Sequence, residues 1–266
     1  MTSNLDEKGL RSIAGEYDVF FIDIWGVLHN GLNLFQNSVE VLEKLEKNKK
    51  QYVLLTNAPR PNLTVIEYLK KMGLDEKKAQ QVYTSGQAAL DQLKTMNSKN
   101  FFHIGPPRDF DLFKTFENQK AEKIDSCDFL LCTGLFDDES ELKFYEKLLL
   151  DHTEKKMICT NPDLVVDRGE EREFCAGTVA KIFEKLGGEV KYFGKPFPEV
   201  YEKAINNLRG KKVICIGDNL NTDIKGANMQ NFDSLLINDG IHKKEISNGI
   251  KELIKKYNVN VNYTQT

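Results

Sequence analysis

The chain has 266 residues, of which 40% are hydrophobic and 29% are charged, a composition typical of a globular protein with one large or two modest domains. Its net charge of −3 offers no broad field for nucleic acid or an anionic membrane surface. No apolar stretch approaches the length of a membrane span, and residues 1–17 are too polar for a signal peptide. We therefore expect a cytoplasmic protein that binds neither nucleic acid nor membranes.

Strand-like apolar runs alternate with amphipathic helical segments, which predicts a mostly parallel sheet covered by helices. The first part of the chain predicts strands at 19–24, 52–56 and 81–83, and helices at 38–47 and 63–72. The middle predicts strands at 101–104, 129–132 and 157–160, and helices at 144–150 and 179–186. The last part predicts strands at 191–193, 213–216 and 234–237, then a helix at 247–257 and a frayed polar tail.

Four of the predicted strands end in residues that can carry chemistry. These ends hold Asp23; Thr56 and Asn57; Lys195 in Gly-Lys-Pro; and Asp218 and Asp223 in Gly-Asp-Asn-Leu-Asn-Thr-Asp. Each set alone is more typical of an ordinary turn or helix cap. The carboxyl ends of parallel strands, however, meet at the edge where open α/β sheets bind ligands. Together the four ends predict one crevice that gathers carboxylates, a hydroxyl, backbone amides and an ammonium.

These residue types are suited to phosphoryl transfer, in which catalysis depends mainly on positioning and electrostatic stabilisation. Asp23 is the candidate nucleophile and would form an aspartyl-phosphate. Mg²⁺ prefers oxygen ligands, and we expect Asp23, Asp218 and the backbone carbonyl of Trp25 to hold it. A tight turn is expected at Gly26, directly after this segment.

Other residues of the predicted crevice would handle the negative charge of the substrate. We expect Thr56 and the Asn57 amide to hold phosphoryl oxygens, and Lys195 to balance the charge of the nucleophile and of the phosphorylated intermediate. Arg60 follows the Thr56–Asn57 turn and is a candidate contact for an anionic substrate, with a surface salt bridge as the equal alternative.

Five segments resemble the motifs of the haloacid dehalogenase (HAD) superfamily, specifically its class IIA branch of NagD-like phosphatases. They are 21–28 (FIDIWGVL), 54–60 (LLTNAPR), 160–164 (TNPDL), 194–196 (GKP) and 216–223 (IGDNLNTD). The resemblance implies an α/β fold with a Rossmann-like catalytic core at 1–84 and 190–266, its mostly parallel sheet carrying helices on both faces. It also implies a large α/β cap domain inserted at 85–189, which closes over the core and selects the substrate.

The resemblance also implies roles for residues outside the predicted crevice. Asn219 and Asp223 would support the metal from behind its direct ligands. The residues implied to bind substrate are Ala58, Arg60, Asn161, Asp163 and Arg168. For Asn161, Asp163 and Arg168 a surface turn with solvated charges is the alternative. Members of this branch often pair through their caps, so a homodimer is expected.

One residue departs from the family pattern. HAD phosphatases usually carry a second aspartate two residues after the nucleophile, where it acts as general acid and base, and here Trp25 stands in its place. Indole cannot exchange protons usefully near neutral pH, and positioned acid–base help contributes typically about 10²–10⁴ in rate. A first motif with tryptophan also resembles a subgroup of class IIA hydrolases.

Three functions remain open from the sequence. The first is a Mg²⁺-dependent phosphatase that acts on a small phosphorylated metabolite, such as a sugar phosphate, with activity weakened by Trp25. The second is a regulatory protein that binds phosphate and metal with weak turnover or none. The third is a metal-independent dehalogenase, which Asp218 and Asp223 disfavour because dehalogenases lack this pair.

Overall fold

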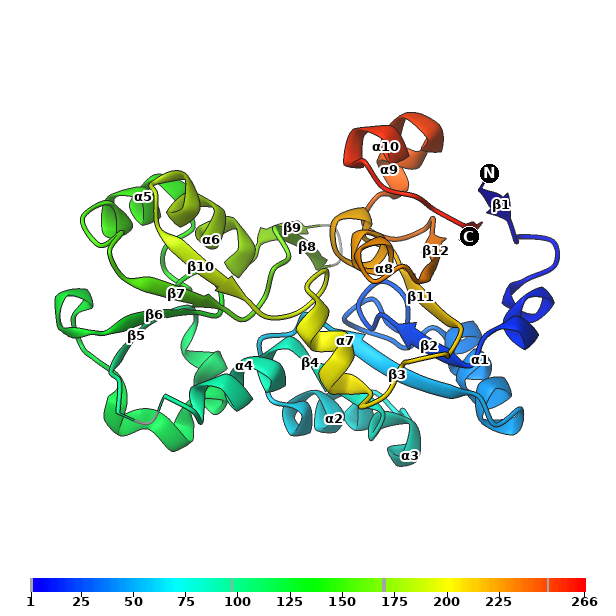
Figure 1. Ribbon diagram of the computed structural model, residues 1–266, viewed down its shortest axis with the longest axis horizontal. Helices are drawn as coiled ribbons and strands as arrows, with labels where there is room; N and C mark the ends of the chain where they lie inside the picture. Colours follow the sequence, from blue (N-terminus) through cyan, green and yellow to red (C-terminus); the bar gives the residue numbers. More distant parts are fainter. Residues whose placement is uncertain (1, 97, 169–170, 248) are drawn as a thin grey trace. The chain divides into compact units, whose positions relative to one another are not determined.

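The structure, a computed structural model, describes residues 2–96, 98–168, 171–247 and 249–266 (Figure 1). The chain divides into two compact units. Unit 1 comprises Met1–Thr56, Ile66–Tyr83 and Lys195–Thr266, and unit 2 comprises Asn57–Val65 and Thr84–Gly194. Among the described residues, no helix has the length and apolar character needed to cross a membrane.

Unit 1 is built around a seven-stranded sheet with the strand order β1-β13-β12-β11-β2-β3-β4. The strands are β1 (Ser3–Asn4), β2 (Val19–Ile22), β3 (Gln51–Thr56), β4 (Val82–Thr84), β11 (Val213–Gly217), β12 (Asp233–Ile237) and β13 (Tyr263–Gln265). The pairings from β1 across to β3 are all parallel. Central strands such as β2 and β11 are buried along their whole length. This confirms the parallel, helix-covered sheet predicted from the alternating pattern.

The helices of unit 1 are α1 (Gln36–Lys47), α2 (Asn62–Lys71, which begins in unit 2), α3 (Glu76–Ala79), α7 (Pro198–Ala204), α8 (Lys225–Met229), α9 (Lys243–Ile246) and α10 (Ile250–Tyr257). Of these, α1 and α2 lie within two residues of their predicted positions, whereas α3, α7 and α8 had no predicted range. Helix α1 buries Leu42 and Leu45, two residues of the apolar face that predicted it. The helix predicted at 247–257 corresponds to α10, which begins three residues later and ends at the predicted residue, whereas the short α9 before it was not predicted. Asn248 lies outside the described residues.

The prediction of a frayed C-terminal tail is wrong. Residues Tyr263–Gln265 form β13, which pairs in parallel with β12 on one side and with β1 on the other. The two ends of the chain therefore lie beside each other (Figure 1). The pairing satisfies backbone groups that a free tail would leave to water, and a polar side-chain pattern gives no sign of it.

Unit 2 carries a four-stranded parallel sheet and a separate antiparallel hairpin. The sheet has the order β10-β7-β6-β5, with β5 (Phe101–Ile104), β6 (Phe129–Cys132), β7 (Lys156–Cys159) and β10 (Glu189–Tyr192). The hairpin pairs β8 (Val165–Arg168) with β9 (Glu171–Phe174). The helices are α4 (Ser85–Leu93), α5 (Leu142–Leu150) and α6 (Ala176–Lys185). The sheet strands and α5 and α6 agree with prediction within a few residues, whereas the hairpin was not predicted.

Candidate active site

The register of β2 against β11 brings Asp23 beside the start of the acidic loop after β11. Ile22 is the register partner of Ile216, and the Asp23 N–H donates to the Ile216 carbonyl at 2.8 Å. Asp23 and Asp218 thus follow two neighbouring strands at the same edge of the sheet. Both side chains are buried, at 9% and 6% exposure.

The turn after Asp23 requires glycine at position 26, as the sequence predicts. Gly26 has φ +82°, and a Cβ there would lie 2.2 Å from Oδ2 of Asp218. Any larger residue would therefore meet both backbone strain and a carboxylate. Gly240 leaves room for the Asp218 side chain in the same way, since a Cβ added at position 240 would lie 2.1 Å from the Asp218 Cβ.

Asp23, Asp218 and Asp223 form a cluster of three buried carboxylates. They offer ligand oxygens that all lie within 4.8 Å of one another. Oδ2 of Asp218 accepts from the Ile241 N–H at 2.8 Å, and Oδ2 of Asp223 accepts from the Asn219 N–H at 3.1 Å. Burial, followed by the charge of Asp23 and that of Asp223, raises the pKa of Asp218 well above its usual range. Burial also raises the pKa of Asp223, to about 6.

Lys195 provides the cation of this cluster. Its Nζ donates to Oδ1 of Asp23 at 2.5 Å and to Oδ1 of Asp223 at 2.6 Å, and the side chain is almost wholly buried. Burial by itself would lower the pKa of Lys195, but the charges of Asp223 and Asp23 outweigh it and raise the pKa. The ammonium therefore stays charged at neutral pH and offsets part of the surplus negative charge.

The donor set fits a divalent cation. Three carboxylates that lie this close repel one another, and a single lysine cannot balance all of them when they are ionised. Oxygen-only donor groups suit Mg²⁺ or Ca²⁺ rather than metals that prefer sulfur or imidazole. Asp23 and Asp218 are the side chains that would hold such an ion, with Asp223 beside them.

The remaining predicted site residues fall into two groups. Thr56, at the end of β3 in unit 1, is 7% exposed. Asn57, Asn161 and Asp163 lie together in unit 2, where the Asn57 Nδ2 donates to Oδ1 of Asp163 at 3.3 Å. Oδ1 of Asn161 accepts from the Asp163 N–H at 3.0 Å. Their roles toward a substrate stay predictions.

Three further predicted substrate contacts also lie in unit 2. Arg60 makes a bidentate pair with Asp111, through Nε and one terminal nitrogen at 2.8 Å each. The Ala58 carbonyl accepts from the Ser85 hydroxyl at 3.0 Å. Arg168 ends strand β8, and its side chain lies outside what the structure describes.

Trp25 is half-buried and packs against the turn that follows it. Its ring lies 5.1 Å from that of His29 in an edge-to-face arrangement, and His29 in turn lies 5.8 Å from Tyr68. The His29 Nδ1 accepts from the Gly31 N–H, and the Tyr68 hydroxyl donates to the Gly31 carbonyl, each at 2.8 Å. Burial lowers the pKa of His29 to about 4, so this imidazole is neutral near pH 7.

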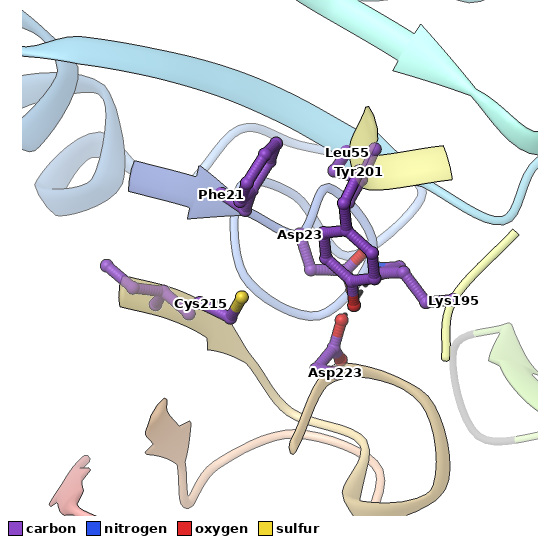
Figure 2. Close-up of a pocket in the computed structure, with 8 residues that line it drawn as sticks. Phe21, Asp23, Leu55, Lys195, Tyr201, Cys215 and Asp223 are labelled. Atoms are coloured by element: carbon purple, nitrogen blue, oxygen red, sulfur yellow. Dashed lines mark hydrogen bonds and ion pairs between the residues drawn. The ribbon is translucent and has the colours of Figure 1, made fainter. Parts of the chain in front are cut away.

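Two contributors to the site were not predicted from the sequence. The Ile241 amide binds Asp218 through its backbone, for which no side-chain signal exists. Tyr201 lines a small pocket together with Asp23, Lys195 and Asp223 (Figure 2). Its place six residues after Lys195, on the first turns of α7, is a spacing that could have indicated it.

Comparisons with known proteins relate this chain to a family of hydrolases. A family profile described as "Haloacid dehalogenase-like hydrolase" matches residues 20–118, and one described as "HAD-hyrolase-like" matches residues 192–257. The chain is 25% identical to a 4-nitrophenylphosphatase of Schizosaccharomyces pombe, over 90% of this chain and 89% of that protein. It is 28% identical to the ribonucleotide monophosphatase NagD of Escherichia coli over 32% of this chain and 34% of that protein.

Solved structures show the same fold over nearly the whole length. A haloacid dehalogenase-like hydrolase of Brucella suis is 30% identical, with a TM-score of 0.80 and coverage of 96% of this chain and 97% of that one. This likeness confirms the HAD Rossmann-like fold expected from the five sequence motifs. The chain therefore belongs to the haloacid dehalogenase superfamily of hydrolases, in its NagD-like class IIA branch of phosphatases.

Proposed function

We propose that the protein is a Mg²⁺-dependent phosphomonoester hydrolase that works through an aspartyl-phosphate on Asp23. The substrate would be a small phosphorylated metabolite, such as a sugar phosphate. One observation carries the proposal: the buried cluster in which Lys195 bonds both Asp23 and Asp223, with Asp218 alongside. A nucleophilic carboxylate, its counter-cation and a metal-ligand set are the parts that transfer of a phosphoryl group requires.

The chemistry divides into two displacements at phosphorus. In the first, an Asp23 carboxylate oxygen forms a bond to phosphorus, and the ester oxygen departs with the electron pair of the broken bond. In the second, water attacks phosphorus, Asp23 is released as a carboxylate, and inorganic phosphate leaves. Lys195 would balance the charge of the nucleophile and the intermediate, while Thr56 and the Asn57 amide hold phosphoryl oxygens.

The metal would be held by Asp23, Asp218 and the backbone carbonyl of Trp25, with Asn219 and Asp223 behind these ligands. When bound, Mg²⁺ offsets the repulsion between a carboxylate nucleophile and an anionic substrate. Asn219 is suited to its supporting role, since its N–H donates to Asp223 and its side chain accepts from Asn221 at 2.9 Å.

Trp25 would narrow the choice of substrate. Without an acidic side chain at this position, a leaving oxygen must depart with little protonation or receive its proton elsewhere. Aryl and acyl phosphates have leaving groups of this kind, and the 4-nitrophenylphosphatase of S. pombe is named for an aryl phosphate. For alkyl phosphates, a residue of unit 2 or the substrate itself would supply the proton.

Unit 2 would act as the cap that selects the substrate. We place the cap at 85–189, with Asn161, Asp163 and Arg168 near the leaving group and Ala58 and Arg60 as further contacts of the substrate. The interlocked Asn57, Asn161 and Asp163 give this part of the proposal its support, because they hold polar side chains in fixed positions after β7. Pairing of two chains through their caps is part of the same proposal.

The decisive experiment is a screen of phosphate esters with and without Mg²⁺, using 4-nitrophenyl phosphate as the reference substrate. We expect hydrolysis that needs Mg²⁺ and is abolished in Asp23→Asn. Asp18→Asn is the matched control, because Asp18 precedes the same strand at its opposite end. Undiminished hydrolysis by Asp23→Asn would remove Asp23 from the role of nucleophile.

The same screen separates an enzyme from a binding protein. Trp25 is the only tryptophan, so its fluorescence reports binding of phosphate or vanadate next to Asp23. Binding with Mg²⁺ but no turnover across the panel would favour a regulatory protein. Halide release from haloacids that a chelator leaves unchanged would favour dehalogenation.

A further inference from the structure

Tyr201 places a hydroxyl without a hydrogen-bond partner inside the catalytic cluster. The residue lies on α7, is 1% exposed, and its ring packs edge-to-face on Phe21 at 5.2 Å. Within the residues that the structure describes, the hydroxyl oxygen has no hydrogen-bond partner. Figure 2 shows it pointing toward the side of the pocket where Asp223 lies. A buried hydroxyl of this kind calls for an explanation, because it has lost its water without gaining a partner.

Packing alone does not explain the hydroxyl. The pocket that Tyr201 lines has no room for a water molecule that could satisfy the oxygen. A Cβ on Gly226 would lie 2.0 Å from the hydroxyl oxygen, so the chain makes room for that oxygen with glycine at the start of α8. Phenylalanine would fill the same space without the cost of an unpartnered oxygen, which leaves a role in the reaction as the reason for tyrosine.

The hydroxyl is suited to be a donor to Asp223. Burial, and then the charges of Asp223 and Asp23, raise the pKa of Tyr201 well above its usual range, so the hydroxyl keeps its proton. Apolar side chains, among them Phe21 and Leu55, line much of the rest of the pocket and offer it no acceptor. The oxygens of Asp223 receive one bond from Lys195 and one from the Asn219 amide, which leaves lone pairs for a third donor.

The demand for that donor changes during the reaction. At rest, the Lys195 ammonium is shared between Asp23 and Asp223. Once Asp23 carries a phosphoryl group, the dianionic phosphoryl oxygens attract Lys195 more strongly than Asp223 does. Asp223 then loses part of its charge-assisted bond at the moment when it must keep Lys195 in place.

We propose that Tyr201 is a positioning residue whose hydroxyl donates to Asp223 and thereby holds Lys195 in place while Asp23 is phosphorylated. The inference rests on the proposed phosphatase function. It explains why an oxygen that costs stability at rest is retained, because the bond it can form is needed only in the phosphorylated state.

The test compares Tyr201→Phe with Tyr17→Phe. Tyr17 is also fully buried in unit 1, but its hydroxyl donates to Asp233 at 2.7 Å, at the opposite end of the sheet. We expect Tyr201→Phe to lower kcat roughly threefold to tenfold, the rate equivalent of one hydrogen bond, with KM unchanged. The thermal unfolding midpoint of Tyr201→Phe, measured without metal, should equal or exceed that of the wild type. Tyr17→Phe should show the reverse: a lower midpoint and an unchanged kcat.

A second measurement does not depend on turnover. Fluoroberyllate with Mg²⁺ mimics a phosphorylated aspartate, and it should raise the thermal midpoint of the wild type more than that of Tyr201→Phe. If the wild type and Tyr201→Phe had the same kcat and the same midpoint shift with fluoroberyllate, the inference would be overturned. So would a fall in kcat accompanied by a loss of midpoint as large as that of Tyr17→Phe. A wild type that neither hydrolyses any ester nor responds to fluoroberyllate would instead refute the proposed function, and the inference with it.

Discussion

The Lys195 ammonium lies 2.5 Å from Oδ1 of Asp23, although 172 positions separate the two residues in the chain. The same ammonium lies 2.6 Å from Asp223, so one buried cation joins the residue after β2 to the loop after β11. A bond between groups this far apart in sequence depends on the whole sheet of unit 1 being assembled. The contacts of Lys195 therefore depend on the folding of unit 1, and so would the catalytic role proposed for it.

Replacing Lys195 by methionine should remove both activity and stability. The change leaves buried carboxylates without their cation, which typically costs about 3–5 kcal/mol in the free energy of unfolding. Adding Asp223→Asn should restore part of that stability, because one of the uncompensated charges is gone, but no activity. Urea unfolding measures these values. Lys212→Met, which breaks an exposed pair with Glu16, serves as the control and should cost about 1 kcal/mol or less. A Lys195→Met protein as stable as that control would contradict the prediction.

Replacing Trp25 by aspartate should restore a proton relay. We expect kcat/KM for an alkyl phosphate such as glycerol phosphate to rise, with an upper bound of about 10²–10⁴ from positioned acid–base catalysis. Hydrolysis of 4-nitrophenyl phosphate should change little, because its leaving group needs little protonation. Trp25→Asn is the matched control, since asparagine is similar in size to aspartate but cannot exchange a proton. Equal rates for the two variants would mean that another group already moves the proton.

Replacing Gly31 by alanine should displace the Trp25 indole. Gly31 has φ +88°, and a Cβ there would lie 2.7 Å from Cη2 of Trp25. Gly73 has a similar φ of +96° but nothing within 4 Å of such a Cβ, so Gly73→Ala isolates the backbone strain. Both variants should lose roughly 1 kcal/mol or more of unfolding free energy, but only Gly31→Ala should shift tryptophan emission. Identical spectra would show that the indole is not held by this turn.

The stability of unit 2 should depend on the ionisation of Asp109. Burial, partly offset by a hydrogen bond from Thr133 and the charge of Arg60, raises the pKa of Asp109 from 3.8 to about 6. Folding therefore favours the neutral acid. The stabilising contribution is complete below about pH 3.8 and is lost as the pH rises through about 6.

Asp109→Asn removes this dependence. The unfolding free energy of the variant minus that of the wild type should rise by roughly 1–3 kcal/mol from pH 4 to pH 8, because only the wild type is destabilised by ionisation of Asp109. Urea unfolding at the two values gives the difference, and Asp138→Asn, at an exposed site of the same unit, should leave the wild-type pH profile unchanged. A constant offset between wild type and Asp109→Asn at both pH values would rule out the assigned ionisation.

The sequence predicted the elements best where the physical signal is local. Buried apolar runs such as Phe129–Cys132 match their strands, and the face that holds Leu42 and Leu45 marked α1. Alternating strands and helices predicted the parallel sheet, and the family motifs predicted the HAD fold. The β8–β9 hairpin was missed because β9 (EREF) is charged and mostly exposed and so gives no apolar signal. Strand β13 was missed because it owes its extended form to pairing with β12 and β1.

The amino-acid sequence by itself determined which residue types stand at the ends of the strands, and that a tryptophan replaces the expected second aspartate. Only the tertiary structure decided that Asp23 and Asp223 share the buried Lys195 ammonium and that Tyr201 places an unpartnered hydroxyl beside them. The reason is physical: strand character follows from neighbouring side chains, whereas burial, charge coupling and the satisfaction of polar atoms depend on every element that packs around the site.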